Sequence, residues 1–344
     1  MERLGQAHHH ADGRAVPEHL LIQGDPSPHM PQATGGRRIA WGELPAEVRT
    51  SIEKLLGSKV ISAISQPGGF SEGVAARLRL ADGSRAFVKA ASSLVAPGVA
   101  QFHRREIEVS RGLPDGVPAP RLLDAYDDGT WVALVFEDIE GRLPAQPWER
   151  DEFDRVLAAT TRLAQVLTPS PIDPATLGRP RLGGWLALAD EGGAGRLASL
   201  SRWAGDHLDE LVALEEAAAS SLTGETLLHG DLYPFNIMLT PDRVFVIDWP
   251  HAWVGAPHGD VLTLLSSASL SGLDPQAFAE EQPLTRDLGP EPINVFLAMH
   301  AGFLLRLAAD AGPGVDRHLV DMATALGKAS LHWLRQRLQA VRKT

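Results

Sequence analysis

The spacing of apolar residues predicts a β-rich first half of the chain. Between residues 60 and 137, apolar runs with strand character alternate with turn signals, among them Asp82-Gly83, which is typical of a tight hairpin. One helical stretch, residues 102–113, interrupts these runs. The predicted strands are 60–66, 74–80, 85–90, 121–126 and 131–136. We therefore expect a mostly antiparallel sheet with one helix.

Helical periodicity replaces the strand pattern beyond Gly141. Apolar residues there recur at intervals of three and four, as on the buried face of a helix. The predicted helices are 148–167, 197–219, 291–309 and 315–340. Between the second and the third of them, residues 226–248 predict a compact strand–loop–strand unit.

The N-terminal segment shows neither period. Residues 1–40 mix His, Gly, Pro and Asp, and we expect a mobile tail there. Order is predicted to begin at Leu44 with a short helix that ends at Gly57. The patterns together predict an α+β fold of two lobes, a sheet lobe over residues 41–140 and a mainly helical lobe over residues 141–344.

Composition narrows the functional class. A length of 344 residues exceeds what one core usually supports, which agrees with two lobes. The net charge of −11 argues against nucleic acid or an anionic membrane as the main partner, and it would suit a cationic small molecule. The chain has no cysteine, and its N-terminus has no apolar signal segment. These features predict a cytoplasmic protein without disulfides or thiol nucleophiles.

Candidate chemistry is concentrated in residues 226–248. Asp231, Asn236 and Asp248 stand in polar loops that are bracketed by apolar strands, so the three side chains can converge at one end of a small hairpin. Carboxylate and amide oxygens are ligands that suit Mg²⁺ bound to phosphates. A further carboxylate beside the metal can accept the proton of an attacking hydroxyl group.

The segment resembles a known family. His229-Gly230-Asp231, then Asn236, then Ile247-Asp248-Trp249 is similar to the motif of the phosphotransferase family of aminoglycoside and other small-molecule kinases, which share the protein-kinase-like fold. The resemblance implies that Asp231 is the catalytic base and that Asn236 and Asp248 hold Mg²⁺. It also implies that His229 orders the loop and that Asp260, in Gly259-Asp260, is a helix N-cap or loop brace.

The resemblance extends to the predicted sheet, where a kinase binds the nucleotide. Lys89, in the third strand, matches the lysine that contacts the α- and β-phosphates. Its partner is expected on the following helix, where Glu106 and Glu108 both lie, and family likeness favours Glu106. The alternative is that both glutamates are solvated helix charges.

Two further segments match nucleotide-binding positions. The turn at residues 67–73 resembles a phosphate-covering loop, in which Gly68 and Gly69 let the backbone approach and Ser71 adds a donor. The exit of the fifth strand resembles the hinge, where backbone groups of Glu137 and Ile139 would bind the purine. Such contacts leave ATP and GTP open as donors.

The departures from protein kinases favour a small acceptor. Gly230 replaces the arginine of the protein-kinase motif, Tyr233 stands at its lysine position, and only 11 residues separate Asp248 from Asp260, which leaves no room for an activation segment. Tyr233 and Phe235 also differ from the histidine and glycine that are common in the small-molecule family.

The sequence thus predicts a kinase that phosphorylates a hydroxyl of a small molecule, such as an aminoglycoside or another antibiotic. The alternatives are a metabolic kinase for choline, homoserine, an amino sugar or a secondary metabolite, and a non-catalytic nucleotide-binding module. Acidic residues that could bind a cationic acceptor, or simply form an exposed helix face, are Asp206, Asp209, Glu210, Glu215 and Glu216.

Overall fold

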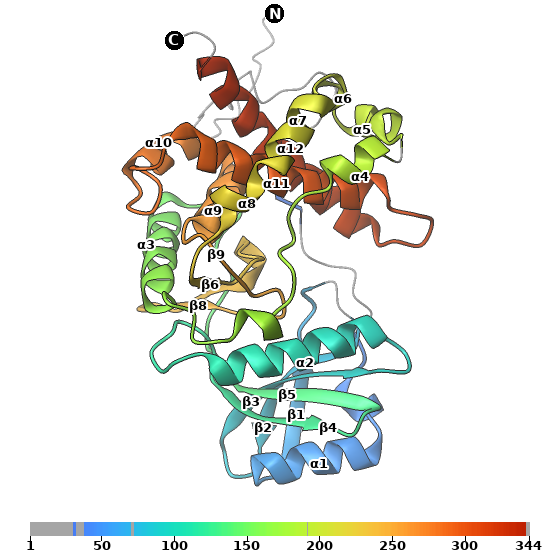
Figure 1. The fold of residues 1–344 in the computed structure, drawn as a ribbon. Coiled ribbons are helices and arrows are strands. Elements are labelled where there is room, and N and C mark those ends of the chain that lie inside the picture. Colours follow the sequence, from blue (N-terminus) through green and yellow to red (C-terminus); the bar gives the residue numbers. More distant parts are fainter. Residues whose placement is uncertain (1–29, 32–37, 70–71, 191, 342–344) are drawn as a thin grey trace, which may run out of the picture.

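The computed structural model describes residues 30–31, 38–69, 72–190 and 192–341 of the chain. The predicted mobile tail, residues 1–40, falls almost entirely outside these ranges. Two parts of the molecule stand apart in Figure 1, a sheet flanked by two helices and a larger helical assembly. We call them the N-terminal and the C-terminal lobe.

The N-terminal lobe contains a five-stranded antiparallel sheet with the strand order β1-β2-β3-β5-β4. Its strands agree with the predicted ones to within two residues at either end. They are β1 (Val60–Ser65), β2 (Val74–Leu80), β3 (Arg85–Ser92), β4 (Leu122–Asp127) and β5 (Trp131–Glu137).

Helices α1 (Ala46–Leu56) and α2 (Pro97–Gly112) cover opposite faces of this sheet (Figure 1). Because successive strand residues point to opposite faces, Ala133 and Val135 of β5 belong to the cluster that includes residues of α1, whereas Leu134 packs in the cluster that includes residues of α2. α1 ends at Gly57, whose φ of 69° is the left-handed conformation of a helix C-cap.

The C-terminal lobe is built mainly of helices. Its longest members are α3, α11 and α12, as the periodicity predicts. The helices are α3 (Arg150–Val166), α4 (Trp185–Asp190), α5 (Ala194–Leu200), α6 (Arg202–Asp206), α7 (Leu208–Glu216), α8 (Ala218–Leu222), α9 (Gly259–Ala268), α10 (Pro275–Glu281), α11 (Pro290–Ala309) and α12 (Arg317–Val341).

The prediction of one continuous helix over residues 197–219 is wrong. Four short helices, α5 to α8, occupy this region and its margins. The first break lies at Ser201, which has extended backbone angles and whose hydroxyl accepts a hydrogen bond from the Ala204 N–H. Serine favours such a cap over a helix interior because its side chain competes for backbone donors.

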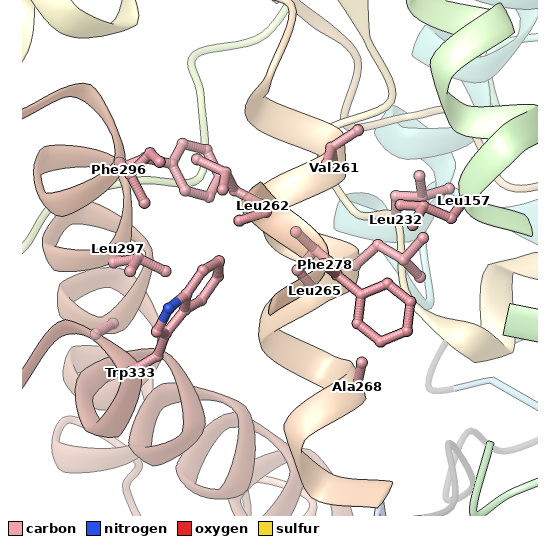
Figure 2. Close-up of a cluster of buried hydrophobic side chains, with 14 of the residues drawn as sticks. Leu157, Leu232, Val261, Leu262, Leu265, Ala268, Phe278, Phe296, Leu297 and Trp333 are labelled. Atoms are coloured by element: carbon pink, nitrogen blue, oxygen red, sulfur yellow. The ribbon is translucent and has the colours of Figure 1, made fainter. Parts of the chain in front are cut away.

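Helix α9 forms the centre of the C-terminal core. Figure 2 shows Val261, Leu262 and Leu265 of this helix between side chains of α11 on one side and Leu157 and Leu232 on the other. All ten residues of α9 are buried. Leu232 is therefore anchored in the core, which fixes the position of the adjacent Asp231.

Helix α11 is long and apolar enough to cross a membrane by length and composition. However, 67% of its most apolar 18-residue window is buried inside the molecule, in the middle of the C-terminal lobe (Figure 1). A core helix of a folded lobe has these properties.

The segment predicted as strand–loop–strand contains three short strands that do not pair as expected. β6 (Thr226–Leu228) pairs with β9 (Trp253–Gly255), and β7 (Ile237–Leu239) pairs with β8 (Val244–Val246). The single-turn helix η4 (Pro234–Asn236) joins β6 to β7. This arrangement puts Asp231 in the loop between β6 and β7 and Asp248 in the loop between β8 and β9, with the β7–β8 hairpin between them.

Candidate active site

The loop that carries Asp231 turns at Gly230. This glycine has a φ of 77°, and a Cβ atom there would overlap the carbonyl oxygen of His251 and crowd the ring of Trp253. Only glycine combines a left-handed backbone with such a close approach. The sequence therefore has glycine directly before the candidate base.

Two buried side chains hold the loop in place. Asp260, at the start of α9, accepts hydrogen bonds from the backbone N–H groups of His229 (2.7 Å) and Gly230 (3.0 Å). His229 Nε2 lies 3.0 Å from the Ile247 carbonyl oxygen, and its Nδ1 accepts from the Asp231 N–H at 3.3 Å. The predictions that Asp260 braces the loop and His229 orders it are confirmed, although the N-cap of α9 is His258.

Asn236 orients the candidate base. Its Nδ2 donates to both the backbone oxygen (2.8 Å) and the carboxylate Oδ2 (3.0 Å) of Asp231. This leaves Oδ1 as the side-chain acceptor of Asn236. The Ile247 N–H donates to the Asn236 carbonyl oxygen at 2.9 Å, which ties this residue to the loop of Asp248.

Asp248 has an unusual backbone conformation. Among the described residues it is the one non-glycine with a positive φ, at 68°. Such a conformation costs free energy and persists where the surroundings impose it, often at functional sites. Its side chain is 42% exposed, so the carboxylate remains open to solvent on one side.

Lys89 connects the two lobes at this point. Its Nζ lies 2.8 Å from Oε1 of Glu106 and 2.7 Å from Oδ1 of Asp248. In β3, Phe87 and Lys89 lie on the face that α2 covers, and this alternation brings the ammonium to Glu106. The predicted pairing of Lys89 with Glu106 is therefore present.

The charges of this triad are mutually dependent. Burial favours a neutral lysine, but the two carboxylates outweigh it and raise the pKa of Lys89. Partial burial of its carboxylate also acts to raise the pKa of Asp248, and Lys89 reverses the effect and lowers that pKa to about 2. Burial raises the pKa of Glu106, whereas Lys89 opposes the rise. We regard Lys89 and Asp248 as charged at neutral pH.

The donor set suits a hard cation that also binds phosphate. No group of three or more His, Cys, Asp or Glu side chains able to hold a metal occurs in the part of the chain that the structure describes. Asn236 and Asp248 could therefore supply only part of a coordination shell. Mg²⁺ fits this pattern, because it is usually held by one or two carboxylates together with water and phosphate oxygens.

The phosphate-covering loop is described only in part. Gly68 and Gly69 follow β1, whereas Ser71 lies outside the described residues. Arg38, which the sequence did not single out, donates from Nη2 to the Gly68 carbonyl oxygen. Burial lowers the pKa of this guanidinium and the Asp248 carboxylate opposes the shift, so Arg38 belongs to the electrostatic surroundings of the triad.

The predicted hinge residues lie at the end of β5, where Glu137 is the last strand residue and Ile139 comes two positions later. The Ile139 carbonyl oxygen already accepts hydrogen bonds from Arg77 Nη2 (2.7 Å) and the Gly141 N–H (2.9 Å). Its own N–H has no hydrogen-bond partner among the residues that the structure describes. A purine at this position would therefore meet the N–H of Ile139 rather than its carbonyl oxygen.

The other side of Asp231 faces the C-terminal lobe. Arg181, in the loop between α3 and α4, donates from Nη1 to Oδ1 of Asp231 at 3.1 Å. Its guanidinium stacks over the ring of Phe303 in α11, 4.9 Å from the centroid. The sequence analysis missed Arg181, because no local motif marks a residue whose partner lies 50 positions away.

A buried hydrogen-bond chain leads from the loop into the C-terminal core. Tyr233 Oη lies 2.7 Å from His300 Nε2, and His300 Nδ1 lies 2.7 Å from Ser330 Oγ. Burial lowers the pKa of His300 to about 4. The imidazole is therefore neutral at pH 7. Because the Ser330 hydroxyl donates to the Leu326 carbonyl oxygen, Ser330 accepts from Nδ1–H, and the tyrosine hydroxyl donates to Nε2. Tyr233 thus has a structural partner where protein kinases have a lysine.

Of the acidic residues considered as acceptor contacts, Glu215 has a structural role. Its carboxylate accepts hydrogen bonds from the N–H groups of Gly184, Trp185 and Leu186 at the start of α4. Asp206 lies 3.8 Å from Arg202 on an exposed surface. Neither arrangement points to a bound acceptor.

Comparison with known proteins agrees with this geometry. Residues 68–288, more than half of the chain, match the model of the Phosphotransferase enzyme family. The chain belongs to this family. The match includes Lys89, the loop of Asp231 and Asn236, and Asp248.

Curated relatives match shorter segments. An aminoglycoside 3'-phosphotransferase of Streptomyces fradiae is 30% identical over 156 residues, which is 42% of this chain and 57% of that protein. A LicA homolog of Mycoplasma capricolum is 27% identical over 64 residues, 19% of this chain and 27% of that protein. The chain thus matches little more than half the length of the first relative and about a quarter of the second.

Solved structures of family members share the fold. The gentamicin complex of APH(2")-IIa superimposes with a TM-score of 0.55 at 15% identity, over 85% of this chain and 98% of that one. A choline/ethanolamine kinase family protein from Mesorhizobium loti gives 0.53 at 17% identity, over 87% and 99%. The fold is protein-kinase-like, an α+β fold with an N-terminal antiparallel sheet and a mainly helical C-terminal lobe, as predicted.

Proposed function

We propose that this protein transfers the γ-phosphoryl group of a nucleoside triphosphate to a hydroxyl group of a small molecule. One observation carries the proposal. Lys89 of the N-terminal lobe contacts Asp248, while Asn236, at the end of the β6–β7 loop, holds the Asp231 carboxylate. Groups suited to bind phosphate, to hold a cation and to accept a proton are thus joined by a short series of contacts, and membership of the phosphotransferase family supports a common role for them.

The nucleotide is the part of the reaction that the N-terminal lobe would bind. Lys89 would hold phosphate oxygens, and Glu106 would keep the ammonium in place. The Gly68-Gly69 backbone would cover the phosphates, with Ser71 as a further donor, and the backbone of Glu137 and Ile139 would bind the purine. ATP is the expected donor. GTP would make the same phosphate contacts and would differ only in the hydrogen bonds of its purine ring.

The metal would be Mg²⁺, held by Asn236 and Asp248. When bound, it neutralises phosphate charge during transfer. Asp248 is suited to this position because its depressed pKa keeps it ionised at neutral pH.

Asp231 would act on the acceptor. The acceptor oxygen forms a bond to the γ-phosphorus while the bond from that phosphorus to the bridging oxygen breaks, which releases the nucleoside diphosphate. The hydroxyl proton passes to the Asp231 carboxylate, and Asn236 holds that carboxylate in position. Most of the rate enhancement would come from positioning and charge neutralisation.

Relatives of this chain include an aminoglycoside 3'-phosphotransferase and a choline/ethanolamine kinase family protein. They support the general class of hydroxyl-bearing small molecules. Aminoglycosides and other antibiotics, choline, homoserine and amino sugars are therefore the acceptors to test first, and a cytoplasmic location is expected.

The test is nucleotide consumption by the purified protein with Mg²⁺ and either ATP or GTP, for each acceptor of this panel. Consumption that depends on one acceptor, and that is lost in the Asp231→Asn variant, would support the proposal. Nucleotide binding without turnover would favour a binding module instead. A protein that neither binds nor consumes a nucleotide would contradict the assignment of the cleft.

A further inference from the structure

The two oxygens of the Asp231 carboxylate face different neighbours. Oδ2 accepts from Asn236, which leads to Asp248 and the phosphate side of the cleft. Oδ1 accepts from Arg181, whose guanidinium rests on Phe303 of α11. Arg181 therefore contacts the carboxylate oxygen that Asn236 does not contact, and under the proposed function this is the side from which an acceptor would bring its hydroxyl.

Arg181 retains donors beyond this bond. A guanidinium carries five N–H donors, and Asp231 is the one hydrogen-bond partner of Arg181 among the described residues. The side chain is 29% exposed and is therefore partly buried, with part of the guanidinium accessible to a ligand. The guanidinium carbon lies 4.9 Å from the centroid of the Phe303 ring, a cation–π contact that supports the side chain and does not use its remaining N–H donors.

The carboxylates around this point are already engaged. Both oxygens of Asp260 accept backbone N–H groups, and this side chain is buried. Glu215 accepts hydrogen bonds at the start of α4.

The neighbouring histidine adds no charge. His251 is neutral at pH 7, because burial lowers its pKa to about 4. An ammonium beside the reacting hydroxyl would meet the guanidinium and would have to compete with it for Asp231.

We propose that Arg181 is a specificity-determining residue. It binds an anionic oxygen group, such as a carboxylate, that the acceptor carries beside its reacting hydroxyl, and it disfavours an amine at that place. The inference rests on the proposed function. The chain's overall charge of −11 would suit a cationic acceptor, but the local charge beside the base is the opposite.

The experiment compares three sugars of similar size that differ in charge. Glucuronate carries a carboxylate, glucose is neutral, and glucosamine carries an ammonium. Their binding to the protein with Mg²⁺ and a non-hydrolysable ATP analogue is measured by titration at constant ionic strength, so that no turnover is needed. The proteins are the wild type, Arg181→Gln, Arg181→Glu and Arg181→Lys.

A matched control lies in the same loop. Arg179 is exposed, and Arg179→Gln removes the same charge two residues away. The wild type and this control should bind glucuronate about 10-fold to 100-fold more tightly than glucosamine, the range expected for a charge-assisted hydrogen bond. Arg181→Gln should abolish the difference, Arg181→Glu should reverse it, and Arg181→Lys should restore it in part.

Thermal unfolding of each variant separates a structural role from a selective one. If Arg181 had only a structural role, its substitution would lower the melting temperature and would weaken the binding of all three sugars to the same extent. Equal binding of the sugars by the wild type, a preference for glucosamine, no binding of any of them, or an unchanged preference in Arg181→Gln would each overturn the proposal. The proposed kinase activity is judged separately, by binding of the nucleotide and by its consumption in the wild type and in Asp231→Asn.

Discussion

Lys89 Nζ lies 2.7 Å from Oδ1 of Asp248, so an ammonium of the N-terminal lobe contacts a carboxylate of the C-terminal lobe directly. The same ammonium is 2.8 Å from the buried Glu106. The Lys89 ammonium therefore neutralises a carboxylate in each lobe, Glu106 in the N-terminal one and Asp248 in the C-terminal one. Each of these three residues is expected to affect stability and nucleotide binding together.

Replacing Lys89 with methionine keeps most of the side-chain volume and removes the charge. Because Glu106 is only 2% exposed, it would lose its counter-ion in an environment that disfavours a bare carboxylate. We expect a loss of about 3 kcal/mol in the free energy of unfolding and weak nucleotide binding. Urea denaturation and nucleotide titration measure the two effects.

The matched control is Lys59→Met. Lys59 and Glu53 are also 2.7 Å apart, but the lysine is 73% exposed. Such surface pairs contribute less than about 1 kcal/mol. Similar losses in the two variants would contradict the view that burial makes the Lys89 pair important.

Asp231→Asn removes the proton acceptor and retains most of the local hydrogen bonds. The amide oxygen can still accept from Arg181 or from Asn236, so the fold and the nucleotide affinity should change little. Turnover should fall by about 10³-fold or more, in line with the loss of a general base. Steady-state rates with saturating nucleotide measure this effect, and wild-type activity in this variant would exclude Asp231 as the base.

The neutral His300 predicts a loss of stability in acid. Burial lowers its pKa to about 4, below the value near 6.5 that it has in an unfolded chain. The unfolded state therefore binds a proton that the folded state does not, so stability is complete above about pH 6.5 and falls as the pH drops toward 4. The contribution of this residue is on the order of 3 kcal/mol.

His300→Gln isolates this contribution, because glutamine can still accept from Tyr233 and does not titrate. The difference in unfolding free energy between pH 7 and pH 5 should be smaller in this variant than in the wild type. Buried His103, His251 and His258 also have lowered pKa values, so some acid sensitivity should remain. An identical pH dependence in both proteins would show that His300 is not the group that titrates.

Gly230→Ala should damage the active loop more than a comparable change elsewhere. The new Cβ would overlap the His251 carbonyl oxygen, in addition to the strain of a φ of 77°. Gly116→Ala serves as the control, since Gly116 has a φ of 89° and no atom within 4 Å of its would-be Cβ. We expect Gly230→Ala to cost at least about 2 kcal/mol more than the control in urea denaturation, and to lower turnover.

The sequence predicts best where a side chain and its partner follow from a local period. Strand alternation places Lys89 on the face that α2 covers, and helical spacing brings Glu106 to that face. The choice between Glu106 and Glu108 agrees with burial, since Glu106 is buried and Glu108 is exposed. The loop of Asp231 and Asn236 was identified for a similar reason, because the apolar strands on either side define its ends.

The rest depends on contacts between distant segments. Strands of three residues carry too little pattern to reveal that β6 pairs with β9 rather than with β8. Arg181 comes from a loop without any motif, and it contacts both Asp231 and Phe303 of α11, which lie far from it in the sequence. The break between α5 and α6 lies at a single capping residue, Ser201, whose effect a long apolar period obscures.

The connector between the lobes determines where they can pivot. Arg142 and Leu239 exchange two backbone hydrogen bonds, of 3.0 and 2.7 Å, so the chain is already fastened to β7 a few residues after it leaves β5. Any rotation of one lobe against the other must be absorbed by the dihedral angles of residues 138–141. The rotation axis would thus lie beside the predicted purine contacts. In such a rotation, the end of the N-terminal sheet that is farthest from this axis would undergo the largest displacement.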